Sequence, residues 1–295
     1  MADSTLARSR WFVIAAAALF STGGAAIKGT ALTAFQVAGF RSAVAALALV
    51  LLLPAARRGF GRDLLPAAFA YAGTLIFFVL ATKLTTSAAA IFLQSTAPIW
   101  ILLLAPLLLK EPIRLADLPA VGLAAAGLAL VFLGSRDAAV TAPRPELGNL
   151  FALASGLFYA LMMVTMRRLS RDAAAGNDRT LAATVLGNAI AFVATLPLAL
   201  PVASVRSADV VAILYLGVVQ IGLAYWLFSK GLKRLPALEV SLLVLLEPVL
   251  NPLWTWLANG ERPSALASLG GAIMIAALAA RVLLQRGSTS APTPD

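Results

Sequence analysis

Apolar runs of about twenty residues alternate with short polar links along almost the whole chain, and a run of this length crosses the roughly 30 Å hydrocarbon core of a bilayer as one α-helix. The pattern therefore predicts an all-α integral membrane protein with ten transmembrane helices. The ten predicted spans are Trp11–Ala31, Ala34–Ala55, Leu64–Thr82, Ser87–Leu109, Leu115–Gly134, Leu147–Leu169, Thr180–Leu200, Ala208–Leu227, Ala237–Ala258 and Ser264–Leu284.

The composition places the chain among membrane proteins. Hydrophobic residues make up 61% of the 295 residues and charged residues 12%, whereas soluble domains contain about 25% charged residues. The net charge of +10 does not indicate nucleic-acid binding, because the basic residues form short clusters between the apolar runs. The first run continues from Trp11 through Ile27, too far for the apolar region of a signal peptide, so we predict that it is a true span.

The basic clusters also orient the bundle, since cytoplasmic loops of membrane proteins are enriched in Lys and Arg. With a cytoplasmic N-terminus, sixteen basic residues fall on the inner side and five on the outer side. We therefore expect a multi-pass protein of the cell (inner) membrane with both termini in the cytoplasm. The five outer residues are Lys83, Arg136, Arg144, Arg206 and Arg262.

The two halves of the chain resemble each other at an offset of 150 residues. Because each half has five spans, the second half enters the membrane from the opposite side, and such inverted repeats are typical of secondary transporters. We predict a first five-helix repeat at residues 1–140, a second, inverted repeat at 141–286, a central cavity between them, and a disordered tail at 287–295. The residues that coincide at this offset are Lys83 with Lys233, Pro98 with Pro248, and Glu111 with Glu261.

The predicted ninth span contains the most unusual residues, because Glu247 and Pro248 stand in its middle. A carboxylate at this depth must face a cavity or a partner, and proline interrupts helical hydrogen bonding. We predict helix breaks at Pro98 and Pro248, and intramembrane charges at Lys28, Arg41 and Glu247. Two roles stay open for Glu247: a permanent ion pair with Lys28 or Arg41, or exchange of a proton or a substrate ammonium group during transport.

Polar and aromatic side chains form stripes at helical spacing, and each stripe is expected to face the interior because lipid offers no hydrogen bonds. In the ninth span, for example, Glu247, Asn251 and Trp254 share one face. Hydrogen bonding between helices is the alternative role for any single polar residue, and packing is the alternative for Met and aromatic residues. The candidate substrate-binding residues are Ser21, Tyr71, Phe78, Gln94, Tyr159, Met163, Asn188, Glu247, Asn251 and Trp254.

The sequence lacks the residues that several classes of function require. The chain contains no histidine and no cysteine, which removes the usual zinc sites and histidine-based acid–base catalysis. It has no GxxxxGK[ST] phosphate-binding loop and no convergent set of nucleophile, base and charge stabiliser. We therefore expect no enzyme activity, no cofactor, no metal and no nucleic-acid partner. A channel would show rings of selectivity groups, whereas the polar residues here are scattered.

On these features the chain resembles the drug/metabolite transporter superfamily, in its ten-span EamA-type branch. The resemblance implies inverted five-helix repeats, cytoplasmic termini and export of small metabolites, often amino acids. Span 1 departs from the family, because Phe20-Ser21-Thr22-Gly23-Gly24 stands where a Trp-Gly pair is common. The matching features are ten spans in two halves, the Phe40-Arg41 pair in span 2, and the signatures Pro98…Glu111 and Glu247-Pro248…Glu261.

We therefore expect a secondary transporter that exports small organic metabolites by alternating access, with amino acids, aromatic or otherwise apolar, as the leading substrate class. A passive facilitator or channel for small solutes and a sugar-phosphate or nucleotide-sugar antiporter are the alternatives. The expected partners are a small-molecule substrate and the lipid bilayer, and the expected state is a monomer or homodimer. Spans 5 and 10 contain almost no polar side chains and are predicted to lie at the periphery.

Overall fold

The computed structural model describes residues 2–97, 99–100, 118–134, 141–171, 179–232, 243–244 and 246–289. Within these residues all regular structure is helical, and six helices are long and apolar enough to cross a membrane. The prediction of an all-α, multi-pass membrane protein is thus confirmed. The helices are α1 (Ala2–Ser21), α2 (Gly23–Gly29), α3 (Ala34–Leu52), α4 (Leu65–Leu84), α5 (Ser87–Gln94), α7 (Leu118–Gly134), α8 (Pro145–Arg171), α9 (Thr180–Ala199), α10 (Ser207–Leu214), α11 (Ala224–Leu232), α13 (Leu246–Asn259) and α14 (Ala265–Thr289), with short 3₁₀-helices η1 (Pro54–Arg57) and η2 (Arg62–Leu64) and a π-helix η5 (Tyr215–Leu223).

The helix ends follow capping signals in the sequence. At the start of α3, the Gln36 N–H donates to Thr33 Oγ1 over 3.3 Å, and the Thr33 N–H donates to Gln36 Oε1 over 3.0 Å, which is a reciprocal capping box. At the start of α5, the Thr86 hydroxyl accepts a hydrogen bond of 3.1 Å from the Ala89 N–H and so caps the helix. Helix α3 ends at Leu52, two residues before Pro54, whose ring does not fit the interior of a helix.

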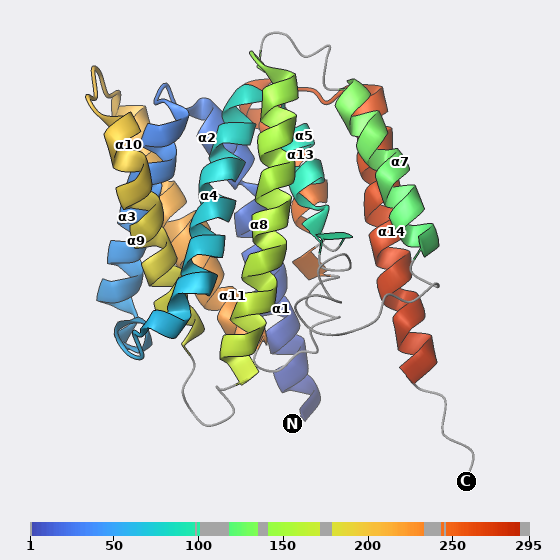
Figure 1. The fold of residues 1–295 in the computed structure, drawn as a ribbon, viewed down its shortest axis with the longest axis horizontal. Helices are drawn as coiled ribbons and strands as arrows, with labels where there is room; N and C mark the ends of the chain where they lie inside the picture. The colour runs from blue at the N-terminus through green and yellow to red at the C-terminus, as the bar shows by residue number, and fades with distance from the viewer. Residues whose placement is uncertain are drawn as a thin grey trace.

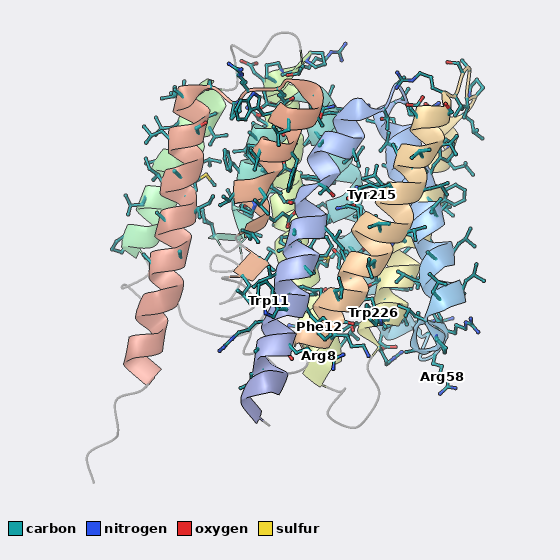
Figure 2. All side chains as sticks on the ribbon, turned by 180° about the vertical axis from the view of Figure 1, so that it is seen from behind. Arg8, Trp11, Phe12, Arg58, Tyr215 and Trp226 are labelled. Carbon is teal, nitrogen blue, oxygen red and sulfur yellow. The ribbon has the colours of Figure 1, made fainter. Side chains whose placement is uncertain are left out.

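The helices stand side by side, and helices distant in sequence pack together (Figure 1). Helix α4 packs against α8 and α9, α3 packs against α9 and η5, and α1 packs against α11 and α13. The first turns of α1 and the last turns of α14 lie at the same end of the bundle, and α2 lies toward the other end (Figure 1). Arg8 and Arg58 lie toward the end that holds the first turns of α1 (Figure 2), in agreement with the charge pattern of the sequence.

Helices α7 and α14 form a pair at the edge of the bundle (Figure 1). A Cβ atom added to Gly127 would lie 2.6 Å from the Gly270 carbonyl oxygen, and one added to Gly270 would lie 2.5 Å from the Gly127 carbonyl oxygen. Small residues at such a crossing let two backbones approach closely, as is common between membrane helices. This position agrees with the prediction that spans 5 and 10 are peripheral.

Span 1 is interrupted at Thr22, which separates α1 from α2. At this point Ser21 Oγ donates to the Ala18 carbonyl over 2.6 Å, and Thr22 Oγ1 donates to the Leu19 carbonyl over 2.7 Å. Hydroxyl groups that bond to nearby carbonyls compete with the helical hydrogen bonds. The span predicted at Trp11–Ala31 is present as Leu6–Gly29, with one interruption of its helix at Thr22.

Span 8 changes its helical form in the middle. Helix α10 leads into the π-helical segment η5, which then returns to α-helix in α11. Helix η5 crosses α3 closely at Gly217, where an added Cβ would lie 2.5 Å from Val44 Cγ1 and 2.8 Å from the Arg41 carbonyl oxygen. Segments of π-helix are rare and occur frequently at functional sites, and nothing in the apolar pattern of Ala208–Leu227 predicted this one.

Helix α13 contains two prolines, one in its first turn and one in its interior. Pro248 lies in the first turn of α13, where a backbone N–H would lack an intrahelical partner in any case. Pro252 lies inside the helix, so the Pro248 carbonyl receives no hydrogen bond from the residue four positions later. Residue 245 lies outside the described residues, and the break at Pro248 therefore stays a prediction.

Other predictions also fall outside the described residues. They include the helix break at Pro98 and the two repeat partners Glu111 and Lys233. At the C-terminus, α14 continues to Thr289 and so includes residues 287–289 of the predicted disordered tail. Residues 290–295 lie outside the described part of the chain.

Candidate functional site

Charged and polar side chains gather at the end of the bundle at which α2 lies. Lys28 at the end of α2 forms an ion pair with Glu261, with 3.1 Å between Nζ and Oε2, and the two side chains are 8% and 2% exposed. Lys28 Nζ also donates to the carbonyl of Thr85 over 2.7 Å and to that of Thr141. Glu261 Oε1 accepts a hydrogen bond of 2.5 Å from the Ser87 N–H at the start of α5. This arrangement joins α2, α5 and the link that precedes α14.

Asn251 extends this polar arrangement into α13. Its Oδ1 accepts a 2.7 Å hydrogen bond from Ser87 Oγ, and both residues are fully buried. Gly24 of α2 packs directly on the pair, since an added Cβ would lie 1.9 Å from Ser87 Oγ. Nearby, Lys83 Nζ donates to the Thr30 carbonyl over 2.7 Å. We call Lys28, Lys83, Ser87, Asn251 and Glu261 the end cluster.

Three hydrogen bonds converge on the interruption of span 1. Trp254 Nε1 of α13 donates to Ser21 Oγ over 2.8 Å. The hydroxyl groups of Thr22 and Tyr215 lie 2.8 Å apart, and Gln220 Nε2 donates to the Phe20 carbonyl over 3.3 Å. Tyr215 and Gln220 belong to the π-helix η5, so span 8 and span 9 both contact the point where span 1 is interrupted.

A second polar group lies between α3, α4, α9 and α11. Arg41 of α3 is 1% exposed and donates from Nη2 to the Leu75 carbonyl over 3.1 Å. Asn188 Nδ2 donates to the Tyr71 hydroxyl over 3.2 Å. The rings of Tyr71 and Tyr225 lie 5.3 Å apart between centroids, and Arg41 interacts electrostatically with both tyrosines.

Tyr225 connects this group to aromatic rings and to Glu247. Its ring centroid lies 4.9 Å from that of Phe20 and 6.4 Å from that of Phe228. Glu247 interacts electrostatically with Tyr225 and with Tyr159, and all three side chains are half-buried. We call the set formed by Arg41, Tyr71, Tyr159, Asn188, Tyr225 and Glu247 the central cluster.

Gln94 lies in a short chain of hydrogen bonds across three helices. Gln94 Nε2 donates to Ser155 Oγ over 2.7 Å, and Ser155 Oγ donates to the Thr74 carbonyl over 3.0 Å. This chain joins α5, α8 and α4. Gln94 itself is half-buried, whereas Ser155 is fully buried.

The structure brings some predicted residues together and separates others. Tyr71 contacts Asn188, Trp254 contacts Ser21, and Glu247 lies near Tyr159, as their inward-facing stripes suggested. Three other candidates have different surroundings: Asn251 belongs to the end cluster, Phe78 is 8% exposed in the apolar core, and Met163 packs on the core beside Tyr159.

The observed ion pairs differ from one of the two roles predicted for Glu247, a permanent ion pair with Lys28 or Arg41. Lys28 has Glu261 as its ion-pair partner rather than Glu247, and the groups that interact electrostatically with Arg41 are tyrosines. Sequence reasoning missed Tyr225 and Gln220, and it singled out Glu261 only as part of the repeat and of the family signature. Tyr225 could have been noticed, because it is one of only four tyrosines in a very apolar chain.

Two grooves lie beside α13, away from the central cluster. One has a volume of about 370 Å³ and is lined by Pro252, Leu253, Trp256, Arg262 and Pro263. The other has a volume of about 430 Å³ and lies between α5, α13 and α14. Of the predicted residues only Pro248 lines the second groove, so neither groove contains the candidate substrate contacts.

Comparisons with known proteins agree with this architecture. The aromatic amino acid exporter YddG of Ancylobacter novellus is 27% identical over 215 residues, which are 72% of this chain and 73% of that protein. A solved crystal structure matches 96% of this chain and 99% of its own, with 23% sequence identity and a TM-score of 0.66, which is a likeness of fold. The model of the EamA-like transporter family matches residues 8–133 and 146–282. Because this match covers well over half of the sequence, the chain belongs to the EamA-like transporter family.

Proposed function

We propose that this protein is a secondary transporter that exports amino acids with aromatic or other apolar side chains by alternating access. Family membership and the exporter relative point to a transporter rather than an enzyme. The observation that best supports the substrate class is the central cluster, in which a carboxylate, tyrosine hydroxyls and aromatic rings lie together between helices of both halves of the chain. Amphipathic small molecules need this combination of apolar walls and a few polar groups.

Helix packing supports two inverted repeats. If the ten spans form two repeats, each span of the first half corresponds to the span five positions later. Helices α4 and α8 are spans 3 and 6. The corresponding spans of the other half are span 8, which ends in α11, and span 1, which begins with α1. The contact of α4 with α8 and the contact of α11 with α1 both occur. The contacts of α3 with α9, α5 with α13 and α7 with α14 each map onto themselves, and all three occur. The two matched segments, 8–133 and 146–282, fit the same division.

The end cluster supports a mechanism with one closed end. It joins Lys28 and Ser87 of the first half to Asn251 and Glu261 of the second half through an ion pair and hydrogen bonds. Contacts between the two repeats that can form and separate are what alternating access requires. Because the basic residues gather at the opposite end, we place the end cluster on the outer side of the inner membrane and both termini in the cytoplasm.

The charges favour amino acids over phosphorylated substrates. Phosphate recognition typically uses Arg or Lys groups that are free to contact the phosphate oxygens. In the described part of the chain, Lys28 is engaged with Glu261 and Lys83 with Thr30, and Arg41 is the cation of the central cluster. The carboxylate of Glu247 would repel a phosphate group but would attract the ammonium group of an amino acid.

The test is transport by the purified protein in liposomes. Vesicles are loaded with unlabelled phenylalanine, tryptophan or leucine, and the uptake of the same labelled amino acid is followed by counterflow, with and without a proton gradient. We expect counterflow of at least one of these amino acids. Parallel vesicles contain glucose 6-phosphate or a nucleotide sugar. Exchange of a phosphorylated substrate without movement of any amino acid would contradict the proposal, and uptake without counterflow would indicate a passive channel.

A further inference from the structure

Arg41 is a buried cation for which the described residues provide no counter-charge. Its side chain is 1% exposed, its Nη2 donates to the Leu75 carbonyl, and its Nε is buried without a hydrogen-bond partner. Within the described part of the chain, no carboxylate forms an ion pair with it. An arginine confined in this way is strongly unfavourable unless an anion compensates it, at least in part of the working cycle.

The groups around Arg41 form one side of the central cluster. Arg41 interacts electrostatically with Tyr71 and Tyr225. Asn188 bonds to the Tyr71 hydroxyl through Nδ2, while its own Oδ1 is buried without a partner. The polar atoms at this place thus exceed the hydrogen bonds available to them, as is typical of a site that a ligand or water completes.

Glu247 interacts with the same tyrosine. Tyr225 interacts electrostatically with Arg41 and also with Glu247, and its ring packs against Phe20 and Phe228. A cation and an anion therefore both interact with one polar aromatic ring. A molecule with the opposite charges and an apolar side chain would complement this arrangement.

We propose that Arg41 is the carboxylate-recognition residue of the substrate site, so that the protein selects a free α-carboxylate at Arg41 and an α-ammonium group at Glu247. This inference rests on the proposed transport of amino acids and adds to it the group by which they are recognised. Arginine suits the role because its planar fork can give two parallel hydrogen bonds to one carboxylate, which a lysine cannot do.

The first test uses the unmodified protein and a matched series of ligands. Binding of phenylalanine, phenylalaninamide, phenethylamine and 3-phenylpropionate is measured by thermal stabilisation of the purified protein in detergent. Loss of a charge-assisted pair of hydrogen bonds weakens binding by about 10- to 100-fold. We therefore expect phenylalaninamide and phenethylamine to bind about 10- to 100-fold more weakly than phenylalanine. Equal affinity of phenylalanine and its amide overturns the inference.

The second test assigns this selectivity to Arg41. In the Arg41→Gln variant, phenylalanine should bind as weakly as the amide does, while the affinity of the amide stays unchanged. Arg41→Lys keeps the charge and should retain part of the preference. The matched control is Glu247→Gln, which should weaken phenylalanine and phenethylamine but leave 3-phenylpropionate unchanged. A folded Arg41→Gln protein that keeps the wild-type preference for phenylalanine over its amide refutes the assignment.

Failure of the proposed function gives a different pattern. If the unmodified protein binds 3-phenylpropionate but none of the amino acids, the carboxylate site stands and the amino-acid proposal falls. If it binds neither, both are wrong. Where Arg41→Gln yields no folded protein, the ligand series on the unmodified protein and on Arg41→Lys decides the question.

Discussion

Lys28 and Glu261 come from opposite halves of the chain and form an ion pair of 3.1 Å whose side chains are 8% and 2% exposed. Removal of one member of a buried pair leaves the other charge without compensation, at a cost of about 3–5 kcal/mol. We expect Lys28→Met to lower the free energy of unfolding by this amount, and Lys28→Met combined with Glu261→Gln to recover most of it. Chemical unfolding of the purified protein in detergent measures both changes.

The control for this prediction is the ion pair of Asp63 and Arg179. Its two hydrogen bonds are 2.5 and 2.9 Å long, but the Asp63 side chain is 56% exposed. Exposed pairs typically contribute about 0–1 kcal/mol, so Asp63→Asn should change the unfolding free energy by no more than that. Equal costs at Asp63 and Lys28 would show that burial does not distinguish the two pairs.

Gly24 should tolerate no side chain, because an added Cβ would lie 1.9 Å from Ser87 Oγ and 2.7 Å from Asn251 Nδ2. Overpacking of this kind costs about 1–3 kcal/mol, and here it would also separate the hydrogen-bonded pair beneath it. We expect Gly24→Ala to lower the melting temperature and the transport rate. Gly29→Ala is the matched control in the same helix, since its Cβ would approach only Asn259 Nδ2, at 3.6 Å. Similar melting temperatures for the two variants would contradict the close packing described for Gly24.

The Glu247→Gln substitution should reduce transport but leave folding unchanged. The described ion pairs do not include Glu247, so loss of its charge should leave the yield of folded protein near that of the unmodified chain. Counterflow of amino acids should fall strongly, because Gln keeps the size of the side chain but gives a substrate ammonium group no counter-charge. The measurement is counterflow across a range of pH values, with protein levels in the vesicles as the reference. Wild-type transport at every pH would show that Glu247 has neither of its two predicted roles, and a low folded yield would favour the structural one.

The orientation of the bundle can be tested with single cysteines, because the native chain has none. Arg144 and Arg58 are both exposed, and we predict that Arg144 lies on the outer side and Arg58 on the inner side. A membrane-impermeant maleimide added to intact cells should label Arg144→Cys and leave Arg58→Cys unlabelled until the cells are opened. The reverse pattern would invert the topology.

The apolar pattern was sufficient to predict the class of the fold and the approximate helix positions. Helix α9, for example, covers Thr180–Ala199 where the sequence indicated Thr180–Leu200. The pattern did not reveal the interruption at Thr22 or the π-helix η5, because both lie within segments whose mean hydropathy suits one continuous span. Hydropathy reports whether a segment can enter lipid, and it is insensitive to the helical geometry that the segment adopts there.

The sequence singled out individual residues of the candidate site but not the contacts between them. Rare polar residues in apolar runs drew attention to Tyr71, Asn188 and Glu247, which belong to the central cluster. Which charges meet is decided by the packing of helices far apart in sequence. The partner of Lys28 is therefore Glu261, in the link after α13, instead of Glu247 in the first turn of α13. Tyr225 was missed for a related reason, since its importance follows from its interactions with both Arg41 and Glu247, which only the fold brings about.

The end cluster has a consequence for how the proposed transport cycle responds to temperature. An outer end closed by an ion pair exposes two charges to water when it opens, and the hydration of these charges offsets much of the interaction that is lost. The hydration free energy of charged groups becomes less favourable as temperature rises. Warming should therefore shift this protein toward the state in which Lys28 and Glu261 are joined, so that cold rather than heat favours the form that is open to the outside.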